Sequence, residues 1–231
     1  MGMSTGIVVL EFPSEDILQG VFIRRLNRFL GLTRVKNSDL YVHIHDPGRI
    51  PLLEPKTKVL IIRRRGNKRK TLYDLLAFKW GGEWIFSHSG YHSKIFENTI
   101  PFLPEFKGEI IREVRLGGSR IDFMIGEIFV EVKGCTWIVG DSCYFPDAPT
   151  SRGRRHVLEL ARQAVNGGKA YIVFLAFSKY PKKIKIARSI DPNFGDAVLR
   201  ATEAGVKFLG IKYVFDGRKL RYVHRIPVEL S

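Results

Sequence analysis

Two carboxylates and a lysine near the middle of this 231-residue chain have the residue types and spacing of a metal-dependent phosphate site. Asp122 and Glu131 are separated by eight residues, and Lys133 follows Glu131 after one more. Carboxylate oxygens are the ligands that Mg²⁺ and Mn²⁺ prefer, and a lysine beside such an ion can orient a water or stabilise charge on a phosphoryl oxygen. The three residues therefore indicate phosphodiester chemistry.

The surrounding residues predict a β-hairpin. Apolar and polar side chains alternate over 120–125 and again over 128–133, which is the period of a β-strand. Between these segments, Gly126 and Glu127 suit a two-residue turn with glycine first. One face of the hairpin is then apolar and the other is charged.

The register of this hairpin decides which side chains meet. We expect Ile125 to pair with Ile128. This register places Asp122 opposite Glu131, with Cβ atoms about 4.5–5.5 Å apart. Two ionised carboxylates at that separation repel each other unless a cation lies between them, which favours a divalent metal. A second interpretation stays open, in which an arginine and a lysine on the same face simply neutralise the two acids.

Several further segments share their order and spacing with a known protein family. They include Ser-Arg-Ile-Asp-Phe at 119–123, Glu-Val-Lys at 131–133 and His-Ile-His-Asp-Pro-Gly-Arg at 43–49, together with 12–28, 144–153 and His156. In these segments the chain resembles the sugar fermentation stimulation protein A family, and the resemblance spans nearly the whole sequence. The Asp, eight residues, Glu-x-Lys spacing alone resembles the more degenerate signature of the PD-(D/E)XK nuclease superfamily.

The resemblance implies a fold and an activity. The fold class is α/β (mixed α+β), with an N-terminal OB-like β-barrel over 1–85 and a PD-(D/E)XK nuclease-like mixed-sheet domain over 86–231. The implied activity is DNA binding with metal-dependent nuclease chemistry. In that family the motif carboxylates correspond here to Asp122 and Glu131, and the motif lysine to Lys133.

Two details of the resemblance concern other parts of the chain. Family members usually have a proline and an asparagine where this sequence has His45 and Asp46. A helix before the nuclease core often supplies a further acidic ligand, and the candidate helix over 91–100 offers Glu97 and Asn98.

From these observations we assign expected roles. Asp122 and Glu131 bind Mg²⁺ or Mn²⁺, with the Val132 carbonyl as a further ligand, while Lys133 orients or activates the attacking water. His156 matches the family pattern, and it shares with Gln163 a helical stripe that could face the charged surface of the sheet. It would position substrate or a water. Additional candidates are Glu113, Asp147 and Gln163, for which a surface salt bridge, a turn and a polar helix flank are equally adequate explanations.

Charge indicates the partner. The formal net charge is +15 and both halves of the chain contribute to it, which favours a polyanion: DNA, with RNA as an alternative. A solubilising surface also explains such a charge. The expected phosphate contacts are a basic hairpin tip and a helix N-terminus, comprising Arg63, Arg64, Arg65, Lys68, Arg69, Lys70, Arg152 and Arg154.

Hydropathy and cysteine content indicate the compartment of the protein. The longest apolar run, 171–177, is too short to span a bilayer, so we expect a cytoplasmic protein without a membrane partner. Cys135 and Cys143 fit free thiols in that compartment. A different class stays open, a non-catalytic, sequence-nonspecific DNA-binding regulator of sugar metabolism. The sequence does not predict an oligomeric state.

The remaining elements follow from apolar spacing and turn residues. We expect barrel strands over 6–12, 21–30, 39–45, 59–64 and 71–80, a helix over 91–100, a strand over 109–115, a helix from Thr150 or Ser151 to about 167, a strand over 170–177, a helix over 193–204, and a strand over 206–215 before a turn at Asp216-Gly217.

Overall fold

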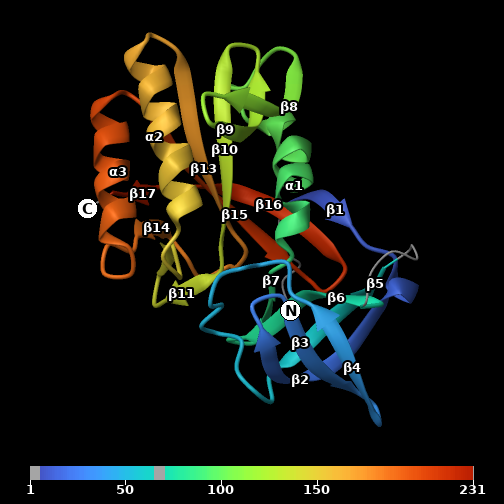
Figure 1. Ribbon diagram of the computed structural model, residues 1–231. Coiled ribbons are helices and arrows are strands. Elements are labelled where there is room, and N and C mark those ends of the chain that lie inside the picture. Colours follow the sequence, from blue (N-terminus) through green and yellow to red (C-terminus); the bar gives the residue numbers. More distant parts are fainter. Residues whose placement is uncertain (1–5, 65–70, 231) are drawn as a thin grey trace.

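Five strands in the N-terminal half close into a small barrel (Figure 1). The computed structural model describes residues 6–64 and 71–230. The barrel strands are β2 (Ile17–Asn27), β3 (Leu30–Val35), β4 (Ser38–His43), β5 (Lys58–Arg63) and β6 (Tyr73–Trp80). Closure comes from the parallel pairing of β4 with β6 at Val42–Tyr73, and alternate side chains such as Phe22 and Ile61 fill the interior. The predicted OB-like barrel is therefore confirmed.

The barrel continues into a larger mixed sheet. Its strands are β7 (Glu83–Phe86), β8 (Ile110–Leu116), β9 (Ser119–Ile125), β10 (Ile128–Cys135), β13 (Lys169–Ala176), β15 (Lys207–Phe215), β16 (Lys219–Ile226) and β1 (Ile7–Glu11). The strand order is β6-β7-β15-β13-β10-β9-β8, in which β13 pairs in parallel with both β10 and β15. The strand expected over 6–12 is present as β1, but it pairs with β16 of the larger sheet, so its prediction as a barrel strand is wrong.

Helices cover both faces of this sheet (Figure 1). The helices are α1 (His92–Thr99), α2 (Ser151–Val165) and α3 (Pro192–Glu203), with short 3₁₀ turns η1 (Ser14–Asp16), η2 (Ser89–Tyr91) and η3 (Ile100–Phe102). Leu160 of α2 packs in one apolar cluster and Phe96 of α1 in the other, on opposite sides of β13. Burial on both faces explains the continuous apolar run of β13.

Capping residues set the start of α2. The Thr150 side chain accepts a hydrogen bond from the Gly153 amide, so the predicted cap is confirmed. All three predicted helices are confirmed to within two residues at either end. No helix in the described ranges is long and apolar enough to cross a membrane.

Several strands were not predicted. In the barrel, the strand expected over 21–30 ends at Asn27 and β3 was not expected, nor was β7 of the larger sheet. A second, four-stranded sheet consists of β11 (Trp137–Val139), β12 (Ser142–Phe145), β14 (Lys183–Ile186) and β17 (Val228–Glu229). These strands are two to four residues long, so the local pattern gives little indication of them. Only β11 and β12 are neighbours in sequence, whereas β14 and β17 join the sheet from distant segments.

Candidate active site

The β9–β10 hairpin positions the motif residues. Ile125 pairs with Ile128, and Gly126 has a φ of +56°, as expected for the glycine of a primed turn. The register is the predicted one, but the backbone ladder ends at Phe123–Val130, so Asp122 and Glu131 occupy the next positions without forming a ladder pair. The Asp122 carboxylate explains the break, because its Oδ2 accepts the Val132 amide at 2.7 Å and the side chain replaces the backbone acceptor.

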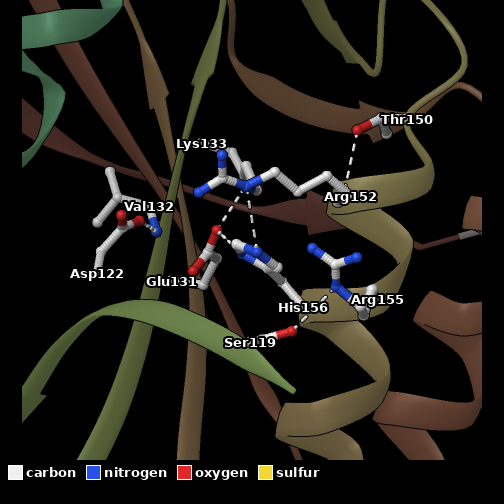
Figure 2. A network of polar contacts seen from close by, with 10 residues as sticks. Ser119, Asp122, Glu131, Val132, Lys133, Thr150, Arg152, Arg155 and His156 are labelled. Atoms are coloured by element: carbon white, nitrogen blue, oxygen red, sulfur yellow. Dashed lines mark hydrogen bonds and ion pairs between the residues drawn. The ribbon is translucent and has the colours of Figure 1, made fainter. Parts of the chain in front are cut away.

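Glu131 lies at the centre of a buried polar cluster (Figure 2). Its side chain is 2% exposed. Oε1 contacts Lys133 Nζ at 2.5 Å and His156 Nδ1 at 2.5 Å. Oε2 is buried and has no hydrogen-bond partner in the structure. An ionised carboxylate in such surroundings has room for one more positive ligand, since one of its two oxygens is unsatisfied.

Asp122 shares this electrostatic environment. Burial, and after it the charge of Glu131, raises the pKa of Asp122 to about 6. Burial also acts to raise the pKa of Glu131, but Lys133 and His156 outweigh it and hold that pKa below its usual value. Lys133 lowers both pKa values, so the three side chains interact although no backbone pair joins the two acids.

The start of α2 supplies the other side of the cluster. His156 contacts Glu131 through Nδ1 and accepts from Arg152 Nε at 3.4 Å through Nε2. These contacts correspond to an imidazole that carries its proton on Nδ1. Arg155 donates to the Ser119 hydroxyl at 3.3 Å and fixes the helix to β9. The predicted placement of His156 toward the charged face of the sheet therefore agrees with the structure.

A pocket of about 590 Å³ opens beside these residues and extends to the barrel. Asp122 and Lys133 line it from the sheet, and Arg152 lines it from α2. Its opposite wall contains the barrel segment of Asp46, Pro47 and Gly48. Arg25 of β2 donates to the carbonyls of Asp46 and Gly48. Glu131 lies behind this surface.

Asp147 joins the two walls. Its Oδ2 accepts the Ile50 amide at 2.8 Å across 97 positions of sequence. Burial, followed by the charge of Asp147, raises the pKa of Asp46 to about 6. Asp147 is thus placed at the pocket, where its established contact is with the barrel backbone.

The other predicted residues have more varied positions. Glu113 has a left-handed φ of +56° at the position of β8 that lies opposite Asp122 but is not paired with it, and its exposed carboxylate lies 3.8 Å from Arg120. Gln163 packs its amide over Gly168 at the far end of α2, away from the pocket. Val132 lines the pocket, with its amide bound to Asp122 as described above.

The structure describes only some of the residues that were predicted to contact DNA. Arg152 and Arg154 lie in the first turn of α2, and the Arg154 side chain is exposed. Arg63 is exposed at the end of β5, whereas Arg64 donates to Asp74 at 2.9 Å. Four members of the predicted hairpin tip lie outside the described residues, namely Arg65, Lys68, Arg69 and Lys70.

Helix α1 does not deliver the expected acidic ligand. Glu97 forms ion pairs with Arg112 and Lys94, and the Asn98 amide donates to the Val9 carbonyl, so neither residue lies at the site. The residues that α1 places in the pocket wall are His92 and Ser93.

His92 is a site residue that the sequence reasoning missed. Its Nε2 is buried without a hydrogen-bond partner, and burial lowers its pKa to about 3, with smaller contributions from His88 and Lys133. The ring covers Gly134, where an added Cβ would lie 2.1 Å from the imidazole. A histidine in the first turn of the helix and a glycine directly after the motif lysine were the available signals.

Comparisons with known proteins agree with the geometry. Residues 90–219 match the family model described as the sugar fermentation stimulation protein RE domain, and residues 23–87 match the N-terminal OB domain of the same family. A sugar fermentation stimulation protein homolog of Thermotoga neapolitana is 38% identical over 221 residues, covering 95% of this chain and 97% of that protein. A homolog of Pyrobaculum neutrophilum is 40% identical, covering 94% and 96%.

A solved structure is similar along the same length. The structure described as Pyrococcus furiosus SfsA in complex with Ca²⁺ superposes with a TM-score of 0.91 at 33% identity, covering 96% of this chain and 99% of that one. Both the expected fold and the expected resemblance are thereby confirmed. The chain belongs to the sugar fermentation stimulation protein family.

Proposed function

We propose that this protein is a divalent-metal-dependent nuclease that binds DNA without reading its sequence. The observation that supports this most directly is the state of Glu131. Its carboxylate is buried, one oxygen is satisfied by Lys133 and His156, and the other is unpartnered beside a second acid, Asp122. A hard divalent cation relieves both the repulsion between the acids and the unsatisfied oxygen.

The residues present fit such an ion. Asp122 and Glu131 would hold Mg²⁺ or Mn²⁺, with the Val132 carbonyl as a further ligand. When bound, the ion supplies Lewis acidity toward phosphoryl oxygens and a lower pKa for a coordinated water. The Ca²⁺ complex described for the Pyrococcus furiosus relative supports a divalent-ion site in the family.

The remaining groups act on the substrate. Lys133 lines the pocket, so its ammonium can leave Glu131 to stabilise charge on a phosphoryl oxygen or to orient the attacking water. His156 holds the Glu131 carboxylate in place from the side away from the pocket. Arg152 lines the pocket from the helix N-terminus, where the guanidinium and unpaired amides favour a phosphate.

The positive charge of the chain supports DNA as the substrate. The formal net charge is +15, and Arg154 and Arg63 present exposed cations on both halves. Contacts of this kind are made to phosphates, so binding should weaken steeply as salt rises, whatever the DNA sequence.

A cleavage assay tests the proposal. Labelled DNA is incubated with Mn²⁺ or with EDTA and with wild-type protein, Glu131→Gln, Lys133→Ala or the control His224→Gln, whose histidine lies away from the pocket on β16. We expect metal-dependent cleavage by the wild type and the control, and its loss in the other two variants. Equal cleavage by all four proteins would identify a contaminating enzyme and overturn the assignment.

The assay also separates the competing functions. DNA binding without cleavage under any divalent ion would favour the non-catalytic, sequence-nonspecific regulator of sugar metabolism. Preferential protection of labelled DNA by unlabelled RNA would instead make RNA the substrate.

A further inference from the structure

A second buried carboxylate, Asp74, is contacted by nitrogen atoms of His45, His88 and Arg64, which come from three separate segments. Asp74 lies on β6, His45 follows β4, and His88 follows β7. Asp74 Oδ2 is 3.1 Å from His45 Nε2 and 3.2 Å from His88 Nε2. The two imidazoles stack with centroids 3.9 Å apart, and one potential ligand atom from each of the three residues lies within 4.8 Å of the others.

These side chains are removed from solvent and incompletely satisfied. The exposed fractions are 2% for Asp74, 4% for His88 and 14% for His45. Asp74 Oδ1 and His88 Nδ1 are buried without a hydrogen-bond partner in the structure. Hydrogen bonding alone explains this arrangement poorly, because the donors crowd onto one carboxylate oxygen while the other receives none.

The spacing suits a tetrahedral ion. Zinc–nitrogen and zinc–oxygen bonds of about 2.0–2.1 Å at tetrahedral angles place neighbouring ligand atoms about 3.3 Å apart. The observed separations of 3.1 and 3.2 Å are close to that value. Two imidazoles and one carboxylate form the donor set typical of Zn²⁺, whereas Mg²⁺ prefers oxygen ligands alone.

Arg64 is the group that opposes a cation here. It donates to Asp74 Oδ2 at 2.9 Å, but its side chain is 36% exposed and can move. The unpartnered Oδ1 offers it a second acceptor on the same carboxylate. An ion on Oδ2 would have to displace Arg64 from that oxygen, so the arginine lowers the affinity of the site for a cation.

We propose that His45, Asp74 and His88 form a binding site for a borderline divalent ion of the Zn²⁺ class, with water as the fourth ligand. The site is separate from the carboxylate pair on β9 and β10 and does not depend on nuclease activity.

The proposed ion site lies next to the barrel wall of the pocket. His45 directly precedes Asp46, Pro47 and Gly48, which form the barrel wall of the pocket. The His45 carbonyl already accepts the Ser89 hydroxyl at 2.8 Å, and Ser89 leads into α1. A bound ion would therefore fix this wall to the segment that carries His92.

Zinc titration of EDTA-treated full-length protein by calorimetry tests the proposal, with Co²⁺ absorption as a reporter of tetrahedral geometry. We compare wild type with H45Q, H88Q, R64Q, E131Q and the control H224Q. We expect one ion per chain with a tetrahedral Co²⁺ spectrum in wild type, E131Q and H224Q. Affinity should fall at least about tenfold in H45Q and H88Q and should rise in R64Q, which lacks the competing cation.

Two results would overturn the proposal. One is unchanged binding in both H45Q and H88Q, and the other is loss of the ion in E131Q with retention in H45Q, which would place zinc at the carboxylate pair. Circular dichroism of each metal-free variant establishes folding. If the more buried H88Q fails to fold, the partly exposed H45Q decides the outcome.

Discussion

Glu131 and Asp74 are two buried carboxylates of the same molecule with opposite surroundings. Each has one oxygen crowded by donors and the other buried without a partner. Glu131 has a second carboxylate, Asp122, in its electrostatic environment and a pocket in front of it. Asp74 instead has two imidazoles and an arginine.

The difference teaches how one fold can select two kinds of ion. Two acids that repel each other attract a hard cation held by oxygens, and the adjoining pocket gives substrate access to it. A single acid between imidazoles attracts a borderline ion held partly by nitrogen. We therefore assign chemistry to the first cluster and positioning of the barrel segment to the second.

Among the substitutions that test this comparison, Glu131→Gln should cause the largest loss of activity. Removal of the charge leaves Lys133 and His156 without their anion and removes an ion ligand, so Mn²⁺-dependent cleavage should fall by at least about 100-fold. His88→Gln, the matched change at the other cluster, should leave cleavage close to wild type at saturating Mn²⁺. Initial rates on labelled DNA measure both, and equal losses would contradict the division of roles.

Asp122→Asn should make the metal-free protein more stable. The folded-state pKa of about 6 exceeds the ordinary 3.8, so the folded protein binds this proton more tightly than the unfolded chain does. The free energy of unfolding therefore rises as the pH falls from about 6 to about 4, and above pH 6 the ionised group costs up to about 3 kcal/mol.

Urea denaturation at pH 7.5 and pH 4.5 measures this effect. The variant should be the more stable protein at pH 7.5, and the two curves should converge at pH 4.5. Asp46, whose pKa is also raised to about 6, is present in both proteins, so their difference isolates Asp122. A variant less stable than wild type at pH 7.5 would show that the carboxylate is not electrostatically unfavourable.

A smaller effect is expected for His156→Ala. The imidazole orients Glu131 without lining the pocket, so its loss should weaken Mn²⁺ binding about 10- to 100-fold while leaving saturated cleavage less affected. Asparagine, which can still donate to the carboxylate, should restore part of the affinity. A fall in saturated rate with unchanged Mn²⁺ affinity would instead place His156 in the chemical step.

The smallest effect concerns the contact between the two regions. Asp147→Ala leaves the Ile50 amide without its acceptor and should cost about 1–2 kcal/mol in the free energy of unfolding. Asp147→Asn keeps an acceptor oxygen and should be close to wild type. Denaturant unfolding compares them, and equal stability of the two variants would remove the contact as a link between barrel and sheet.

Local patterns predicted much of this molecule. The period-two alternation and Gly126 predicted the hairpin and its first three pairs, and the cap at Thr150 predicted the start of α2. The placement of His156 against the charged face followed from its position on that helix. Each of these features depends on residues that are neighbours in sequence.

Features that depend on distant residues were not predictable in this way. The hairpin ladder ends early because the Asp122 side chain competes with the backbone for the Val132 amide. An alternating pattern of apolar and polar residues does not reveal such competition. His92 reaches the pocket only through the packing of α1. His45, Asp74 and His88 are 14 to 43 positions apart and meet only when the barrel closes.

The central claim is that Asp122 and Glu131 together bind a hard divalent ion. Anomalous scattering from a crystal soaked in Mn²⁺ tests it directly. We predict a peak within about 2.5 Å of a carboxylate oxygen from each residue, with Lys133 displaced from Glu131 Oε1. Absence of a peak there, in crystals that show one at His45, Asp74 and His88, would contradict the claim.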